Sequence, residues 1–173
     1  KALIHSFEPV AAGKRMSWQI WSCLQKPKVL IMVSKQEHCL TDLLFREKNG
    51  ELPIEIALVA SNHLATQPIA VAQNIDFRHL PIDADSKAAQ EALLLEEIER
   101  RGIDVVVLAR YMQILSPEFC QAMAGKIINI HHSFLPGFKG AKPYHQAFEH
   151  GVKLIGATAH YVTAELDEGP IIE

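Results

Sequence analysis

Two nearly unbroken apolar segments constrain the fold of this 173-residue chain more than any other feature. Residues 54–60 and 104–109 are built mostly of Val, Ile, Leu and Ala. Runs this short and this uniform are typical of strands that are buried on both faces, as in a parallel sheet covered by helices. We therefore predict that both segments are strands of such a sheet.

The rest of the chain alternates between short apolar runs and longer amphipathic ones. Strands are further predicted at residues 28–33, 127–130, 154–162 and 171–172. Helices are predicted at residues 40–48, 86–101, 117–123 and 143–150. A glycine follows each predicted helix, at positions 50, 102, 125 and 151, where a left-handed C-terminal cap belongs. In the second helix, the predicted apolar stripe contains Ala89, Ala92, Leu93 and Leu95.

This alternation predicts the fold class: an α/β domain with a doubly wound, mostly parallel sheet and right-handed crossovers. In such sheets, ligands bind beyond the carboxyl ends of the strands. Residues 1–26 precede the first strand and are predicted to form a connecting arm. Because the last residues resemble the beginning of a strand, we expect residues 27–173 to be a domain truncated at its carboxyl end. We expect sequence to be missing before the arm as well.

Composition excludes several classes of protein. With 49% apolar residues, 21% charged residues and a net charge of −3, the chain matches neither a disordered tail nor a nucleic-acid-binding protein. Its three widely spaced cysteines argue against a disulfide framework and favour a reducing, cytoplasmic location. No apolar run approaches the roughly 20 residues that cross a bilayer. We therefore expect neither a nucleic-acid partner nor a membrane.

One strand end carries polar residues suited to chemistry. If residues 127–130 form a strand, its alternation places Asn129 and His131 on the same face. The strand ends there, so both side chains point toward the crevice where ligands bind. An amide donor and a titratable imidazole together can polarise a carbonyl and move a proton.

An acidic loop, residues 165–170, provides a candidate partner for this pair. A lone aspartate such as Asp167 is most often a turn or capping residue. Beside an Asn-x-His strand end, the same carboxylate could orient a water molecule and hold the imidazole protonated. Spacing alone leaves both interpretations open.

These segments resemble the folate-dependent formyltransferase superfamily. Residues 128–136, Ile-Asn-Ile-His-His-Ser-Phe-Leu-Pro, are similar to its Asn-x-His-x-Ser-x-Leu-Pro signature, and residues 166–170 to its aspartate loop. The His-His doublet and the Ser-Lys-x-x-His-Cys-Leu loop at residues 34–40 narrow the resemblance to the branch that hydrolyses 10-formyltetrahydrofolate to tetrahydrofolate and formate. The resemblance runs from about residue 27 to residue 173. Members of this branch carry an amino-terminal regulatory domain, of which the arm would be the trailing connector.

The resemblance implies a role for each matching residue. Asn129, His131 and Asp167 would be catalytic, and the folate would be the substrate, without a metal or other cofactor. Residues expected to bind the substrate are Arg110, Tyr111, Met112, His132, Ser133, Gly140 and Lys142. A homo-oligomer is a further expectation, and the formate would supply purine synthesis and balance the one-carbon folate pools.

Other interpretations of the same residues remain open. The protein could be a transferase that delivers the formyl group to an amine, or a folate-binding module without catalysis. The loop at residues 34–39 has no glycine to cradle a phosphate and carries Glu37, which disfavours a phosphorylated acceptor. His131 and His132 could be metal ligands, but adjacent residues of an extended chain point in opposite directions. Cys39 heads a predicted apolar helix and is more often simply buried.

Overall fold

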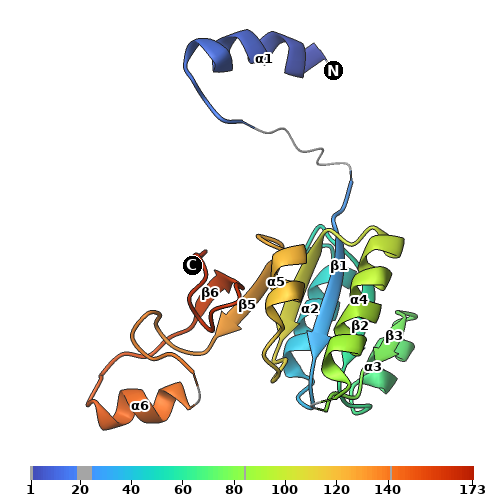
Figure 1. The fold of residues 1–173 in the computed structure, drawn as a ribbon, viewed down its shortest axis with the longest axis vertical. Helices are drawn as coiled ribbons and strands as arrows, with labels where there is room; N and C mark the ends of the chain where they lie inside the picture. The colour runs from blue at the N-terminus through green and yellow to red at the C-terminus, as the bar shows by residue number, and fades with distance from the viewer. Residues whose placement is uncertain (1, 19–24, 84, 141) are drawn as a thin grey trace.

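The structure is a computed structural model that describes residues 2–18, 25–83, 85–140 and 142–173. Its elements, in chain order, are α1 (Ala2–Gly13), β1 (Lys28–Val33), α2 (His38–Lys48), β2 (Glu55–Ser61), α3 (Gln67–Ala72), β3 (Phe77–His79), α4 (Lys87–Arg101), β4 (Val105–Ala109), α5 (Pro117–Ala122), β5 (Ile127–His131), α6 (Pro143–Glu149) and β6 (Thr158–Tyr161). Figure 1 shows the sheet at the centre of the molecule, with α1 and α6 lying away from it.

The strands form one sheet in the order β3-β2-β1-β4-β5-β6. Every neighbouring pair is parallel except β5 and β6, which are antiparallel. The chain moves from β1 outward to β2 and β3, then returns to the other side of β1 for β4. The switch point therefore lies between β1 and β4, and this arrangement confirms the predicted doubly wound, mostly parallel sheet.

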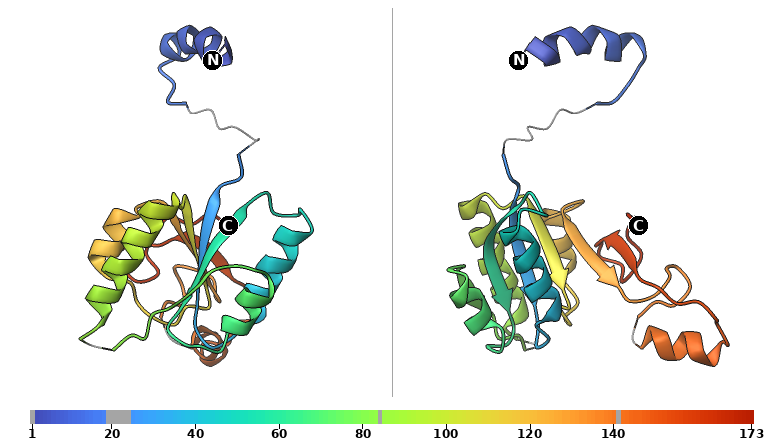
Figure 2. Two further views of the ribbon diagram at one scale, coloured as in Figure 1. Left: turned by 90° about the vertical axis from the view of Figure 1, so that its right-hand side faces the viewer. Right: turned by 180° about the vertical axis from the view of Figure 1, so that it is seen from behind.

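Burial on both faces explains why the central strands are so uniformly apolar. Along β1, Leu30 and Met32 belong to the core beneath α4 and α5, whereas Val29, Ile31 and Val33 belong to the core beneath α2 and α3. Two views of the ribbon show these two helical layers on opposite sides of the sheet (Figure 2). The period of two along the strand thus delivers side chains to two separate cores.

Several element boundaries agree closely with the sequence predictions. The predicted strand at residues 28–33 is β1 as it stands, and those at 54–60, 104–109 and 127–130 differ from β2, β4 and β5 by a residue or two. The four predicted helices correspond to α2, α4, α5 and α6. The glycines at positions 50, 102, 125 and 151 all adopt positive φ, as predicted for helix caps.

Other predictions were wrong, and weak local signals explain most of them. The strand predicted at residues 154–162 shrinks to β6, because Leu154 and Ile155 lie exposed before it. Residues 171–172 form a single bridge, from Ile171 to His160, instead of a strand. The six-residue helix α3 and the three-residue strand β3 were missed, since neither is long enough to show a clear period.

The buried face of α4 also differs from the predicted stripe. Glu91, Leu94 and Ile98 are the buried residues, whereas Leu93 is 52% exposed. The buried residues of α4 therefore follow an i, i+3, i+7 spacing, and one of them, Glu91, carries a carboxylate. Glu91 accepts a hydrogen bond from the backbone N–H of Ser116, at the start of α5, and this contact compensates for its burial.

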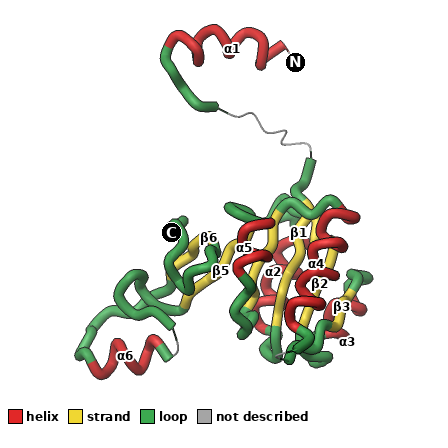
Figure 3. The backbone as a smooth tube through the Cα atoms, viewed as in Figure 1, coloured by secondary structure: helices red, strands yellow, loops and turns green. Residues whose placement is uncertain are grey.

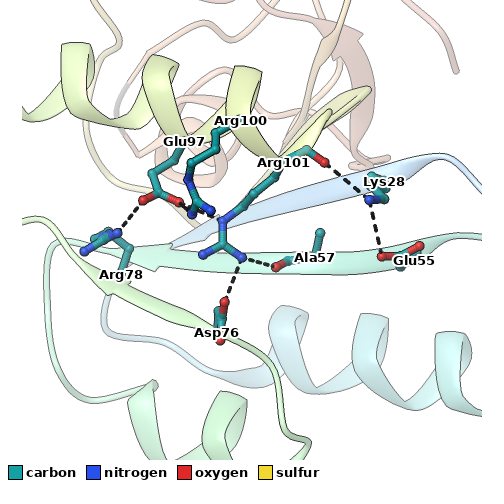
Figure 4. A network of polar contacts seen from close by, with 8 residues as sticks. All are labelled: Lys28, Glu55, Ala57, Asp76, Arg78, Glu97, Arg100 and Arg101. Carbon is teal, nitrogen blue, oxygen red and sulfur yellow. Dashed lines mark hydrogen bonds and ion pairs between the residues drawn. The ribbon is translucent and has the colours of Figure 1, made fainter.

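An ion-pair network anchors the carboxyl end of α4 to the amino edge of the sheet (Figure 4). Glu97 pairs with Arg78, Arg100 and Arg101. Arg101 extends the network by donating to Asp76 at 2.7 Å and to the backbone carbonyl of Ala57 at 3.3 Å. Because three guanidinium groups surround it, the pKa of Glu97 falls from 4.5 to about 2.

The predicted connecting arm contains the helix α1, which the sequence analysis did not anticipate. Trp18 packs edge-on against Phe7 of this helix, with ring centroids 5.2 Å apart. Trp21 and Cys23 lie outside the described residues. The tube in Figure 3 shows α1 apart from the sheet. Within the described ranges, no helix is long and apolar enough to span a membrane.

Candidate active site

The candidate site lies where β5 ends at the carboxyl edge of the sheet. Asn129 and His131 occupy alternate positions of β5, and both face the loop that contains Asp167. Ile130, between them, is 54% exposed on the opposite face, whereas His131 is 5% exposed. The alternation of the strand therefore aims both polar side chains the same way, as predicted.

Asp167 is the buried carboxylate at the centre of this group. Its Oδ1 lies 3.5 Å from His131 Nδ1 and 3.8 Å from His160 Nε2. Its Oδ2 accepts a hydrogen bond of 2.9 Å from the backbone N–H of Gly140. Asp167 is 8% exposed and has a φ of 57°, a left-handed conformation that aspartate tolerates better than most residues. The loop thus holds a carboxylate out of water while leaving one oxygen directed at two imidazoles.

The ring of His131 has an acceptor on each side. Its Nε2 lies 2.7 Å from the backbone carbonyl oxygen of Phe138, and its Nδ1 faces Asp167. A neutral imidazole carries one N–H, so it can donate to only one of these oxygens. The ring is therefore held between two oxygens, with its Nδ1 on the side of Asp167.

His160 is a member of the group that sequence reasoning missed. It is 2% exposed, and the antiparallel register of β5 and β6 places it directly opposite Asn129. Its Nδ1 lies 3.0 Å from the carbonyl oxygen of Tyr161, so that nitrogen is the donor. Its Nε2 then accepts from Asn129 Nδ2 at 3.2 Å. A histidine seven residues before Asp167, on the strand that leads to the loop, was the available signal.

A small cavity opens beside these side chains. It has a volume of about 90 Å³, and Asn129, His160 and Asp167 lie in its wall. The wall is completed by Tyr111 and residues 113–115, after β4, by residues 162–167, after β6, and by Leu108. Tyr111, predicted to bind substrate, is among these residues, and burial raises the pKa of its hydroxyl, helped by the nearby Glu91. The lining of the cavity mixes apolar and polar side chains, as that of ligand sites commonly does.

Arg110 and Met112, also predicted to bind substrate, line a second cavity of about 310 Å³ at the switch point. Arg110 has a φ of 60° and donates from Nε to the side chain of Gln36 at 2.9 Å. Ser34 Oγ accepts from the backbone N–H of Met112 and donates to Asn62. Gln113 belongs to the walls of both cavities, which are therefore adjacent.

The remaining predicted binding residues lie around His131 and Asp167 in different ways. Gly140 contacts Asp167 directly through its backbone. Ser133 is 2% exposed, and its carbonyl oxygen accepts from Thr158, so the contact recorded for it is structural. Lys142 adopts a φ of 53° before α6, whereas its neighbour Lys139 pairs with Glu168 beside the aspartate. The substrate-binding roles of these residues stay predictions.

The two adjacent histidines lie closer together than the sequence analysis expected. The rings of His131 and His132 are 5.5 Å apart rather than on opposite sides of the chain. The alternation rule fails here because β5 ends at His131 and the backbone bends at His132. Among the described residues, no group of three or more His, Cys, Asp or Glu side chains is arranged to hold a metal ion. Cys39 is partly buried, which raises its pKa, and neither it nor Cys120 forms a disulfide.

Comparison with known proteins agrees with the resemblance found in the motifs. The formyl transferase family model matches residues 27–173, and the chain belongs to this family. A formyltetrahydrofolate deformylase from Corynebacterium sp. (strain P-1) is 60% identical over 171 residues, covering 99% of this chain and 60% of the relative. The chain spans about half to three fifths of the length of the curated relatives it matches.

Solved structures give the same grouping. A formyltetrahydrofolate deformylase from Pseudomonas syringae pv. tomato is 49% identical with a TM-score of 0.91, covering 99% of this chain and 58% of that one. Glycinamide ribonucleotide transformylase 1 from Symbiobacterium toebii is 33% identical with a TM-score of 0.79, covering 91% of this chain and 74% of that one. Hydrolytic and transferring relatives therefore share this fold.

Proposed function

We propose that this protein hydrolyses 10-formyltetrahydrofolate to tetrahydrofolate and formate. The observation that carries the proposal is the buried Asp167 carboxylate, 3.5 Å from His131 and in the wall of a cavity that also contains Asn129. A carboxylate, an imidazole and an amide donor are the groups that addition of water to a formyl carbon requires. The relatives that are named formyltetrahydrofolate deformylase support the same reaction.

In the proposed mechanism, water adds to the formyl carbon while Asp167 accepts one of its protons. The formyl oxygen becomes an oxyanion, which the Asn129 amide stabilises by a hydrogen bond and the nearby His131 imidazolium by its positive charge. Once Asp167 is protonated, the His131 Nδ1–H that faces it is free for the next step. His131 then donates its proton to N10 as the carbon–nitrogen bond breaks. Tetrahydrofolate and formic acid result, and the acid ionises to formate. Removing one donor to such an oxyanion costs on the order of 10²–10³ in rate.

His160 serves this mechanism by orienting Asn129. Because its Nε2 accepts one amide hydrogen of Asn129, the amide is held in one orientation and its second hydrogen is available to the formyl oxygen. His160 is in turn held by the carbonyl of Tyr161. The burial of His160 keeps water from competing for these contacts.

The small cavity suits one end of the folate. A volume of about 90 Å³ is below the roughly 300–1,000 Å³ of most ligand pockets, so it would receive only part of the pterin. Backbone groups of residues 162–167 border the cavity and can pair with the polar edge of a flat heterocycle. In this proposal, Tyr111 packs against the ring, and Arg110 and Met112 border the adjoining cavity.

The accompanying proposals concern location and fate of the product. We place the reaction in the cytoplasm, where free thiols such as Cys39 and Cys120 persist. The folate is the partner, no cofactor takes part, and the formate would supply purine synthesis. An amino-terminal regulatory domain before residue 27 and a homo-oligomer stay predictions.

The test is formate release by the purified full-length protein from 10-formyltetrahydrofolate, with no acceptor added. We expect equimolar formate and tetrahydrofolate. The same reaction is then run with glycinamide ribonucleotide present. Formyl transfer that outpaces hydrolysis would place the protein among the transferases, and tight folate binding without turnover would identify a binding module.

A further inference from the structure

His132 lies between two aromatic rings that come from distant parts of the chain. Its ring is 5.5 Å from that of His131, at an interplanar angle of 36°. On its other side it is 5.4 Å from the ring of Tyr144 in α6, which it meets edge-on at 67°. The three rings form a continuous row from α6 to the nitrogen atoms that face Asp167. We call this row, His131, His132 and Tyr144, the ring row.

The segment between His132 and β6 is tied to the sheet by further contacts near its two ends, where Thr158 bonds with the backbone of Ser133 and Leu135. Residues 132–157 leave the end of β5, include α6 and return at Thr158 (Figure 1). In α6, Pro143 and Ala147 are the buried residues, whereas Phe148 is 84% exposed. Contacts of this segment with the catalytic group are concentrated at Phe138 and Gly140, and at the ring row.

We propose that His132 is a positioning residue: in ring contact with both His131 and Tyr144, it helps to hold the His131 ring in place and couples α6 to the hydrolysis of the formyl group. This inference rests on the proposed function for its kinetic consequence. The hydrogen bond of His131 to Phe138 and its contact with Asp167 hold the ring at two atoms in its plane. Because the ring can turn only about its Cβ–Cγ bond, both contacts oppose that turn, and the neighbouring His132 ring, 5.5 Å away, adds a further contact against it.

The electrostatic surroundings suit this role. Burial lowers the pKa of His132, and the positive charges of Arg110 and His131 lower it further, against the opposite effect of Asp167. A neutral His132 can lie beside a protonated His131 without repulsion between two cations. Arg110 follows β4, Asp167 follows β6 and Tyr144 is in α6, so groups from three other parts of the fold surround the ring. The ring therefore acts through its flat apolar surface, without a charge of its own.

The experiment compares variants that remove a ring with variants that keep it. His132→Ala and Tyr144→Ala each break the row, whereas His132→Phe and Tyr144→Phe keep a flat ring at the same place. We expect His132→Ala to lower kcat about three- to tenfold with little change in KM, because an aromatic pair of this kind is worth little more than one order of magnitude in rate. His132→Phe should recover most of that loss. In the double alanine variant the two losses should be less than additive.

Nuclear magnetic resonance of the His131 ring provides a readout that does not depend on turnover. We expect its carbon-bound proton signals to shift in His132→Ala and to return toward wild-type values in His132→Phe. Equal kcat losses in His132→Ala and His132→Phe, or an unchanged kcat in both, would overturn the inference while the proposed function stands. If the wild-type protein releases no formate, the proposed function fails. The positioning role of His132 is still tested in that case, because unchanged His131 signals in His132→Ala would overturn it.

Discussion

Two carboxylates, Glu97 and Asp167, are each surrounded by cationic or potentially cationic groups, yet they lie in regions with opposite properties. Glu97 is near the amino edge of the sheet, where three arginines pair with it. Asp167 belongs to the candidate site at the end of β5, where it faces His131, His160 and one backbone N–H. Arginine keeps its charge at every pH that a protein survives, whereas histidine gains and loses its charge near neutrality.

The difference between the two regions shows that the partners of a buried or half-buried carboxylate decide whether its role is structural or chemical. The partners of Glu97 are arginine side chains, which are permanently charged and only donate hydrogen bonds. The resulting network holds α4, β2 and β3 together (Figure 4). At Asp167 the partners are two imidazoles and one backbone N–H, the backbone is in a left-handed conformation, and a cavity lies alongside. Strained backbone of this kind is typical of functional sites. Arg110 and Lys142 share this conformation with Asp167, as do Arg15 and Asn74 in other parts of the chain.

The comparison is sharpened most by Asp167→Asn. We expect kcat for formate release to fall by about 10³-fold or more, because an amide cannot accept the proton of water. Asparagine also tolerates the left-handed backbone, so folate binding and thermal stability should stay close to wild type. Steady-state kinetics and folate titration measure this. Lost binding with an unchanged kcat would make Asp167 a substrate contact.

Gly169→Ala tests whether the aspartate loop tolerates any side chain at that position. A Cβ there would lie 1.6 Å from the carbonyl oxygen of Tyr161, a backbone atom that cannot move alone. We expect a loss of about 3 kcal/mol in the free energy of unfolding, together with lower activity. Denaturant unfolding measures the effect. Gly13→Ala is the control, since its Cβ meets nothing within 4 Å; a loss equal to that of the control would contradict the packing argument.

Glu97→Gln should have the reverse outcome of Asp167→Asn. We expect the free energy of unfolding to fall by about 1–3 kcal/mol, since hydrogen bonds to charged groups contribute about that much and three arginines lose their counterion. The kcat for formate release should not change, because the network belongs to the opposite edge of the sheet. Chemical denaturation and the kinetic assay together check this. A kcat loss at constant stability would break the distinction between the regions.

The smallest expected effect is the acid dependence of the same network. The pKa of Glu97 in the folded state is about 2, below its ordinary value of 4.5. Its stabilising contribution is therefore complete above about pH 4.5 and is lost as the pH falls toward 2. The difference in unfolding free energy between wild type and Glu97→Gln should be constant from pH 7 to about pH 5 and smaller at about pH 3. A difference that is unchanged at about pH 3 would argue against the ion pairs as its source.

Sequence reasoning was most successful where local pattern and burial agree. The apolar runs predicted the central strands, the capping glycines predicted the helix ends, and the period of two placed Asn129 and His131 together. It failed where length was short, as at β3 and α3, and where a chain bend cancels the alternation, as at His132. It also missed His160, because its relation to Asn129 depends on which strand lies beside β5.

What the sequence by itself determined is the set of chemical groups and their local directions: a parallel sheet buried on both faces, with an amide and an imidazole at the end of one strand. Tertiary structure alone decided that these groups meet Asp167. Since β6 is antiparallel to β5, it leads the chain away from the carboxyl edge, and residues 162–167 must fold back to bring the carboxylate within 3.5 Å of His131. The contacts of Gly140 and Gly169 maintain that return. Such contacts join residues far apart in sequence or depend on close backbone packing. The periodicity of a local sequence segment therefore cannot predict them.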